Sequence, residues 1–228
     1  MLYIGLVDGV VAGNLAAHAA GTDAFRVFVA TLILIPPAIA GARLLYVTTR
    51  WKTQYRDFPA RIWNRAEGGM EMFGGMPVML LLSVPVLWAV GLGFGAFWDA
   101  ASLTIMTGLA FTKIGCFLNG CCAGRASQSR IARSLPDTRG VRVKRIPVQC
   151  LEAAWAIAVL VIAIALVGRL PFQGALFLVV AAVYSAGRLA FESMREHEAG
   201  AGRIAVGSAF SVLTVVSAVA ILVVQWPR

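Results

Sequence analysis

Long apolar stretches, separated by polar breaks, repeat along the whole 228-residue chain. A stretch of about 17 to 25 apolar residues is long enough to cross a bilayer as a helix. Asp8, Asn14 and His18 interrupt the first stretch, which is therefore the weakest. The pattern predicts an all-α, polytopic integral membrane protein with about seven transmembrane helices in one domain over residues 1–228. The expected spans are residues 2–20, 25–48, 75–94, 97–114, 148–167, 172–190 and 204–225.

The connections between these spans alternate between short turns and long basic loops. The short turns lie near 21–24, 93–97 and 168–172, and the long loops lie near 49–73, 115–147 and 191–203. Seven spans place all three long loops on the side of the membrane that holds the N-terminus. We expect loops 49–73 and 115–147 to form a small extramembrane region on that face.

Composition and charge support the membrane assignment. The chain is 59% hydrophobic and 14% charged, whereas a soluble domain is nearer a quarter charged. The net charge is +9, and 16 of the 20 Lys and Arg residues lie on the long-loop face, as five in 49–73, eight in 113–147 and three in 188–203. Basic loops are typical of a cytoplasmic face or of contact with anionic lipid, so we expect no nucleic-acid partner.

Two pairs of glycines occur in "GGMEMFGGM", residues 68–76. Glycines such as Gly74 and Gly75 allow the backbone to approach a ligand closely, or allow a short re-entrant segment to dip into the membrane. A flexible turn before the third span explains the same residues. The sequence leaves these interpretations open.

A second polar stretch, "KIGCFLNGCCAGR", ends the fourth span at residues 113–125. Lys113 and Arg125 flank a glycine-rich turn that begins at Asn119. Two cations beside backbone N–H groups suit a phosphate. Alternatively, both side chains extend to the lipid headgroups.

Three of the four cysteines, Cys116, Cys121 and Cys122, lie in this stretch, and Cys150 lies further on. They do not form a disulfide-framework pattern. Their C-x4-C-C spacing lacks the C-x2-C pairs that characterise zinc sites, and no histidine is nearby. We therefore expect packed thiols, no metal and no cofactor.

Gln149 and Glu152 share a face at the start of the fifth span, in "RIPVQCLEA", residues 145–153. Pro147 suits the first turn of a helix, and a glutamate there suits the helix dipole. These residues therefore form either a favourable helix start or a polar pair that faces an internal cavity.

Tyr184, Arg188 and Glu192 are spaced four residues apart in "YSAGRLAFESMRE", residues 184–196, and share one helix face. An arginine at the centre of a membrane span costs about 2.5 to 3.5 kcal/mol, so Arg188 requires a partner. Glu192 or a lipid phosphate can serve. With Arg43 and the cations of the earlier stretch, these residues predict a lipid-accessible central cavity that holds an anionic headgroup.

The order of the motifs resembles the prolipoprotein diacylglyceryl transferase family of bacteria. The matching segments are "GARLLYV" (41–47), "GGMEMFGGM" (68–76), "KIGCFLNGCCAGR" (113–125), "PVQCLEA" (147–153) and "YSAGRLAFE" (184–192). The resemblance implies a multi-pass enzyme of the bacterial inner membrane. Such enzymes transfer diacylglyceryl from phosphatidylglycerol to the lipobox cysteine of an exported prolipoprotein, through a thioether, and release glycerol phosphate.

This chain departs from the family at several positions. Phe73 stands where the family usually has a histidine, and Lys113 stands where its signature begins with arginine. Cys116 and Cys121 replace an asparagine and a glutamate. Glu71 is the nearest replacement base by sequence, and Cys121 or Cys122 is another reactive candidate if nearby cations lower its pKa.

We expect two groups of site residues. The catalytic candidates are Arg188, Tyr184, Glu71 and Cys121. The substrate-binding candidates are Lys113, Arg125, Asn119, Gly124, Arg43, Gln149, Glu152, Gly74 and Gly75.

Alternative functions and the membrane orientation stay open. A divergent relative that acts on another thiol or small acceptor fits the sequence, as does a non-catalytic protein that binds phosphatidylglycerol or a similar anionic phospholipid. The positive-inside rule predicts that the 16-cation face is cytoplasmic. The resemblance implies instead that this face is periplasmic, where an exported prolipoprotein is accessible.

Overall fold

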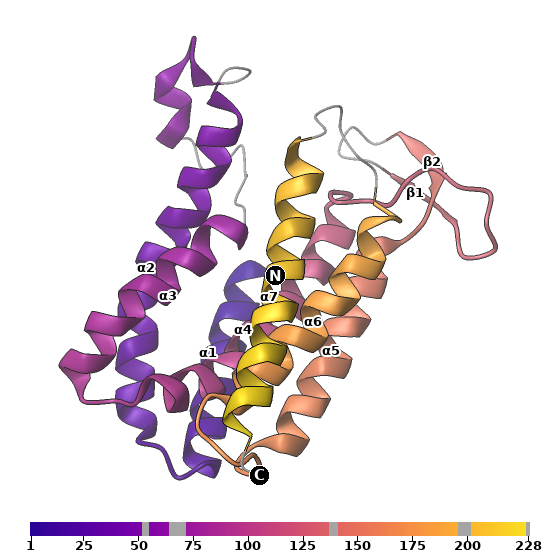
Figure 1. Ribbon diagram of the computed structural model, residues 1–228. Helices are drawn as coiled ribbons and strands as arrows, with labels where there is room; N and C mark the ends of the chain where they lie inside the picture. Colours follow the sequence, from indigo (N-terminus) through magenta and orange to yellow (C-terminus); the bar gives the residue numbers. More distant parts are fainter. Residues whose placement is uncertain (52–54, 64–71, 137–140, 196–201, 227–228) are drawn as a thin grey trace. The chain divides into compact units, whose positions relative to one another are not determined.

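The computed structural model describes the chain except residues 52–54, 64–71, 137–140, 196–201 and 227–228 (Figure 1). Each of the seven expected spans corresponds to a long helix, which confirms the prediction of a helical, polytopic protein. The helices are α1 (Leu2–Ala19), α2 (Ala24–Thr49), α3 (Met72–Val90), α4 (Phe94–Leu118), α5 (Val148–Leu166), α6 (Ala175–Glu192) and α7 (Gly202–Gln225). The described residues also form a 3₁₀ helix, η2 (Pro59–Trp63), and an antiparallel pair, β1 (Arg133–Pro136) and β2 (Arg142–Arg145).

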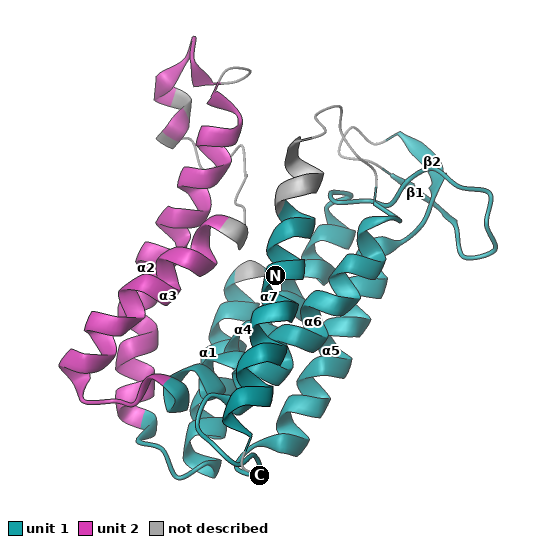
Figure 2. Ribbon diagram, viewed as in Figure 1, with its two compact units in different colours: residues 1–24, 95–228 teal, residues 25–94 magenta. Residues whose placement is uncertain are grey.

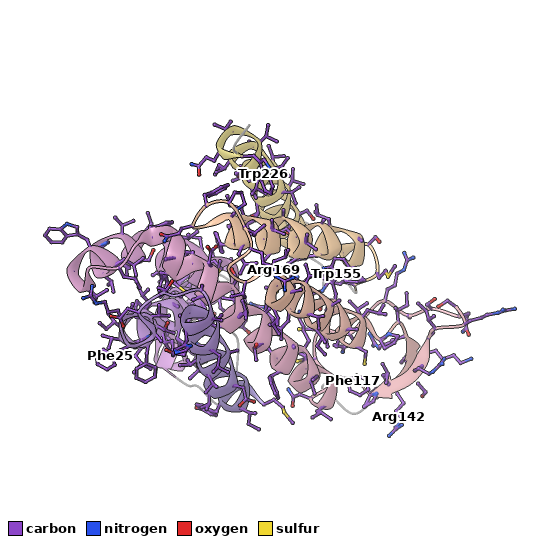
Figure 3. All side chains as sticks on the ribbon, turned by 90° about the horizontal axis from the view of Figure 1, so that it is seen from below. Phe25, Phe117, Arg142, Trp155, Arg169 and Trp226 are labelled. Carbon is purple, nitrogen blue, oxygen red and sulfur yellow. The ribbon has the colours of Figure 1, made fainter. Side chains whose placement is uncertain are left out.

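The described helices present apolar surface outward, as a lipid environment requires. Five of them, α2, α4, α5, α6 and residues 207–225 of α7, are long and apolar enough to cross a membrane, and residues 74–90 of α3 form a shorter apolar helix. Leu81, Trp88 and Val224 are 73%, 86% and 82% exposed. Figure 3 shows mostly carbon on the outer helix faces, whereas nitrogen-bearing side chains gather at the hairpin near Arg142.

The chain forms two compact units, residues 1–24 with 95–228 and residues 25–94 (Figure 2). The second unit contains α2 and α3, which cross at glycines. A Cβ on Gly75 would lie 2.8 Å from the Ala38 carbonyl oxygen, and one on Gly74 would collide with the Gly41 carbonyl oxygen. The glycine pair therefore permits close approach to a neighbouring helix. The expectation of a single domain remains a prediction.

In the first unit, α1 packs against α4 through Gly5, Gly9 and Gly13, which are spaced four residues apart. A Cβ on Gly9 would lie 2.7 Å from the Thr104 carbonyl oxygen, and one on Gly13 would collide with the Thr104 hydroxyl. Small residues at such spacing let two helix backbones approach closely within a membrane. This packing explains how α1 joins the bundle although polar residues interrupt it.

A carboxylate near the start of α4 fixes the start of α6. Asp99 accepts hydrogen bonds from the backbone N–H groups of Gly174, at 2.7 Å, and of Phe177, at 2.9 Å. It therefore caps α6 from a neighbouring helix. Lys113 lies 14 residues after Asp99, and Arg188 lies 14 residues after Gly174. At about 1.5 Å per residue, both cations lie about 21 Å along their helices, so they reach the same end of the bundle.

The glycine contact between α1 and α4 gives a stability prediction. We expect Gly9→Ala to lower the free energy of unfolding by about 1–3 kcal/mol, because the added methyl group meets a backbone oxygen. Gly108→Ala is the matched control, because its Cβ would lie 3.7 Å from its nearest neighbour, the Gly5 carbonyl oxygen. Thermal unfolding in detergent measures both, and equal midpoints for the two variants would contradict the packing.

Candidate functional site

Three cations converge on Glu152, which lies just after the first turn of α5 with its side chain only 3% exposed. The Lys113 Nζ lies 2.7 Å from Glu152 Oε2, and Arg188 Nη1 and Arg195 Nη1 lie 3.6 Å and 3.4 Å from Oε1. Arg188 also pairs with Glu192 across 3.4 Å. We call these five residues the charge cluster. They come from α4, α5, α6 and the segment that follows α6.

The loop after α4 holds Arg195 in this position. The Arg125 N–H donates to the Met194 carbonyl oxygen at 2.9 Å, and Gly124 forms a bridge with Arg195. On its other side, Gly124 donates its N–H to the Ile146 carbonyl oxygen at 3.1 Å, and a Cβ there would collide with that oxygen. Gly124 is therefore required by close backbone packing that joins the loop, the start of α5 and the end of α6.

The charge cluster carries one positive charge in excess, since it contains three cations and two carboxylates. The side chains of Lys113 and Arg188 are 11% exposed, and that of Arg195 is 18% exposed. Tyr184 is buried one turn before Arg188 on α6. Partly desolvated cations that keep excess charge attract an anion more strongly than surface cations do. The arrangement is suited to holding a phosphate.

The sequence stretch that follows α4 also builds a cluster of thiols. The helix ends in a Schellman motif: the Gly120 N–H donates to the Phe117 carbonyl oxygen, and the Cys121 N–H donates to that of Cys116. This motif brings the side chains of Cys116 and Cys121 together. Cys122 follows with a left-handed φ of 58°, and the sulfur atoms of the three cysteines lie within 4.8 Å of one another. We call these three residues the thiol cluster.

The thiols differ in acidity. The pKa of Cys122 is lowered from the usual thiol value by hydrogen bonds from Cys116 and Cys121 and by the charges of Lys113 and Arg195. The hydrogen bond with Cys116 lowers the pKa of Cys121, but its contact with Cys122 and its burial outweigh that effect, so its pKa is raised. Of the two reactive candidates, Cys122 therefore favours the thiolate. The catalytic role expected of Cys121 stays a prediction.

The structure places the other expected residues as follows. Gln149 is buried in the first turn of α5 and donates from Nε2 to the Cys121 carbonyl oxygen at 2.8 Å. Asn119 and Arg125 are exposed, and Arg125 contacts the segment after α6 through its backbone. Arg43 belongs to the second unit, where its Nη2 donates to the Ile62 carbonyl oxygen at 3.1 Å. Glu71 lies outside the described residues.

Sequence reasoning missed Arg195 as a site residue. It lies seven residues after Arg188 and three after Glu192, so it continues the same helical stripe. That spacing was a usable signal, but α6 ends at Glu192, and only the pairing with residues 124–125 holds Arg195 beside Glu152.

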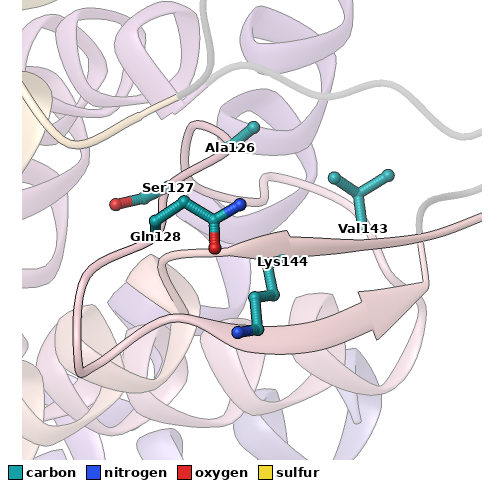
Figure 4. A pocket seen from close by; sticks show the side chains of 5 residues that line it. All are labelled: Ala126, Ser127, Gln128, Val143 and Lys144. Atoms are coloured by element: carbon teal, nitrogen blue, oxygen red, sulfur yellow. The ribbon is translucent and has the colours of Figure 1, made fainter.

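One hollow among the described residues lies apart from the charge cluster. It has a volume of about 520 Å³ and lies between the loop at residues 126–128 and β2 (Figure 4). Its lining residues are Ala126, Ser127, Gln128, Val143 and Lys144. It contains none of the expected site residues. The expected central cavity stays a prediction.

The seven helices define a multi-pass membrane protein, and its first unit holds a buried cluster of charged side chains where α4, α5 and α6 meet. The pattern of the prolipoprotein diacylglyceryl transferase family matches residues 1–224. The chain belongs to this family.

Individual relatives agree with this assignment. The phosphatidylglycerol–prolipoprotein diacylglyceryl transferase of Clostridium botulinum strain 657 is 28% identical over 190 residues, which cover 81% of this chain and 76% of that protein. The enzyme of the same name from Bacillus cereus is 28% identical over 203 residues, with 85% and 74% covered. That of Clostridium kluyveri is 25% identical over 228 residues, with 98% and 89% covered.

The charge cluster predicts unequal roles for its two carboxylates. We expect Glu152→Gln to lower the free energy of unfolding by about 3–5 kcal/mol, because it leaves three partly buried cations without their shared partner. Glu192→Gln is the control, since Glu192 forms an ion pair with Arg188 and, within the described part of the chain, none with Lys113, so it does not join the three cations. Thermal unfolding in detergent should place Glu192→Gln much nearer the wild type. A similar loss in both variants would show that Glu152 is not the centre of the cluster.

Proposed function

We propose that this chain transfers the diacylglyceryl group of phosphatidylglycerol to a prolipoprotein cysteine in the bacterial inner membrane. Membership of the transferase family and the names of the relatives support the reaction. The observation that carries the proposal is the convergence of Lys113, Arg188 and Arg195 on one buried carboxylate. It supplies a site for the phosphate at which the reaction divides the lipid.

The chemistry requires stabilisation of a leaving phosphate. The acceptor thiolate attacks the diacylglyceryl carbon bonded to the phosphate oxygen, so a C–S bond forms as the C–O bond breaks. Glycerol phosphate leaves with the electron pair and gains a negative charge. Positioned cations that meet this charge as it develops lower the barrier. The excess positive charge of the cluster suits this task.

Each cation has a proposed role. Arg188 contacts the phosphate oxygens with its planar guanidinium, which can make two parallel hydrogen bonds. Lys113 and Arg195 add charge from either side, and Glu152 keeps the three cations together while the lipid is absent. Tyr184 lies one turn before Arg188 and is placed to orient the headgroup. The other expected substrate-binding residues keep that role as a prediction.

Activation of the acceptor thiol is the second requirement, because only the thiolate is nucleophilic. Phe73 has no group that accepts a proton. Glu71 is the nearest replacement base by sequence, and the cysteines that follow α4, Cys121 among them, are the other candidate groups for this step.

The test uses purified protein, phosphatidylglycerol vesicles and a lipobox peptide, with the peptide mass as the readout. We expect the wild type to add one diacylglyceryl group to the peptide. Arg188→Ala should slow transfer about 10²–10³-fold, as loss of one stabilising donor does, and Arg188→Lys should restore part of the rate. Arg130→Ala is the control, because Arg130 is an exposed cation outside the charge cluster.

Other outcomes separate the alternatives. Release of glycerol phosphate without peptide modification would indicate a different acceptor. Bound lipid without any turnover would indicate a binding protein. An Arg188→Ala variant as active as Arg130→Ala would contradict the role given to the cluster.

A further inference from the structure

The thiol cluster has the dimensions of a metal site. Its three sulfur atoms lie within 4.8 Å of one another. A zinc–sulfur bond of about 2.3 Å places sulfur atoms about 3.8 Å apart in a tetrahedral site. Movements of less than about 1 Å in three side chains therefore bring the sulfurs to bonding distance. Among the described residues, the cluster contributes three ligands, which leaves a fourth tetrahedral position.

The backbone holds these thiols together. Cys116 and Cys121 meet because the Schellman motif closes on Gly120, with its φ of 68°, and Cys122 turns back through its own left-handed conformation. The hydrogen bond from Gln149 to the Cys121 carbonyl oxygen fixes the loop to α5. The backbone conformation of this turn therefore holds the three sulfur atoms close together. A site held by backbone geometry requires little reorganisation when an ion binds.

The surroundings suit the charge of a metal–thiolate centre. Three thiolates and one Zn²⁺ carry a net charge of −1. Lys113 lies one helical turn before Cys116, and Arg195 forms a bridge with Gly124, two residues after Cys122. These cations compensate the centre and belong to the charge cluster. Cys122 is an exposed residue, whereas Cys116 and Cys121 are half-buried.

We propose that Cys116, Cys121 and Cys122 bind one Zn²⁺ ion, and that its fourth position takes the acceptor thiol. The second half of this proposal rests on the proposed transferase function. A thiol bound to zinc is deprotonated outright, so the ion replaces a general base. The resemblance noted above places Phe73 where the family usually has a histidine, and Cys116 and Cys121 where the signature has asparagine and glutamate.

The acceptor S–H releases its proton to water as the sulfur binds zinc. The sulfur electron pair then forms the C–S bond with the diacylglyceryl carbon. The C–O bond breaks, and glycerol phosphate leaves with its electron pair toward the charge cluster. The zinc ion is neither oxidised nor reduced, and it is not consumed. The thioether product leaves the fourth position because it binds zinc more weakly than a thiolate does.

Cobalt(II) titration of the full chain tests the site without any need for activity. In detergent, with a thiol-free reductant and after chelator treatment, we expect one Co²⁺ per chain, with strong thiolate-to-cobalt absorption that Zn²⁺ abolishes. Cys116→Ser, Cys121→Ser and Cys122→Ser should each weaken binding at least tenfold. Cys150→Ser is the matched control, because Cys150 is an exposed cysteine on α5 outside the thiol cluster. Its spectrum should equal that of the wild type.

Two further measurements test thiol activation. Addition of a lipobox peptide should shift the cobalt spectrum, whereas the same peptide with serine in place of cysteine should not. Chelator treatment should slow transfer at least tenfold, and Zn²⁺ should restore it. Transfer by a metal-free wild type, or equal cobalt binding by the three cluster variants and Cys150→Ser, would overturn the proposal. Cobalt binding without any transfer would support the metal site and would count against the transferase function instead.

Discussion

The site depends on a single buried carboxylate. Three cations at one end of a helix bundle repel one another, and burial increases that repulsion because the local dielectric is low. Glu152 offsets it by pairing with Lys113, Arg188 and Arg195 from three different segments. Such a pair contributes little net stability, because removal of its groups from water is costly. The role of Glu152 is to hold the three cations together. Their combined positive charge exceeds the negative charge of the carboxylates beside them.

The helices are arranged so that this assembly is possible. Asp99 fixes the start of α6 to α4 at the far end of the bundle, and equal spacing along both helices then brings Lys113 and Arg188 to the same level. The cations that the cluster uses are counted among the 16 on the long-loop face. A cation that is held in the bundle by a buried carboxylate differs from a solvated loop charge. Part of that basic excess therefore has a local explanation, independent of membrane orientation.

Hydrophobic periodicity was sufficient to predict seven helices, because lipid imposes one simple requirement on every span. It was also sufficient to place Lys113 and Arg188, which lie on different helices, at the same side of the membrane. Arg195 continues the helical stripe of Arg188 and Glu192, but contacts with residues 124–125, distant in sequence, determine its position beside Glu152. The C-x4-C-C spacing predicted packed thiols rather than a metal site, because it is not a familiar ligand spacing, and the turn geometry after Leu118 is what brings the three sulfurs together. Gly74 and Gly75 allowed several interpretations until the crossing of α2 and α3 was known.

The most direct test of the central claim is the affinity of the purified protein for glycerol phosphate, measured by calorimetry at low salt. A charged hydrogen bond contributes about 1.5–3 kcal/mol, so Lys113→Gln and Arg195→Gln should each weaken binding about tenfold or more. Arg142→Gln, which removes an exposed cation on the hairpin, should leave the affinity nearly unchanged. If all three variants weaken binding equally, or if none does, the phosphate is not held by the cations that Glu152 assembles.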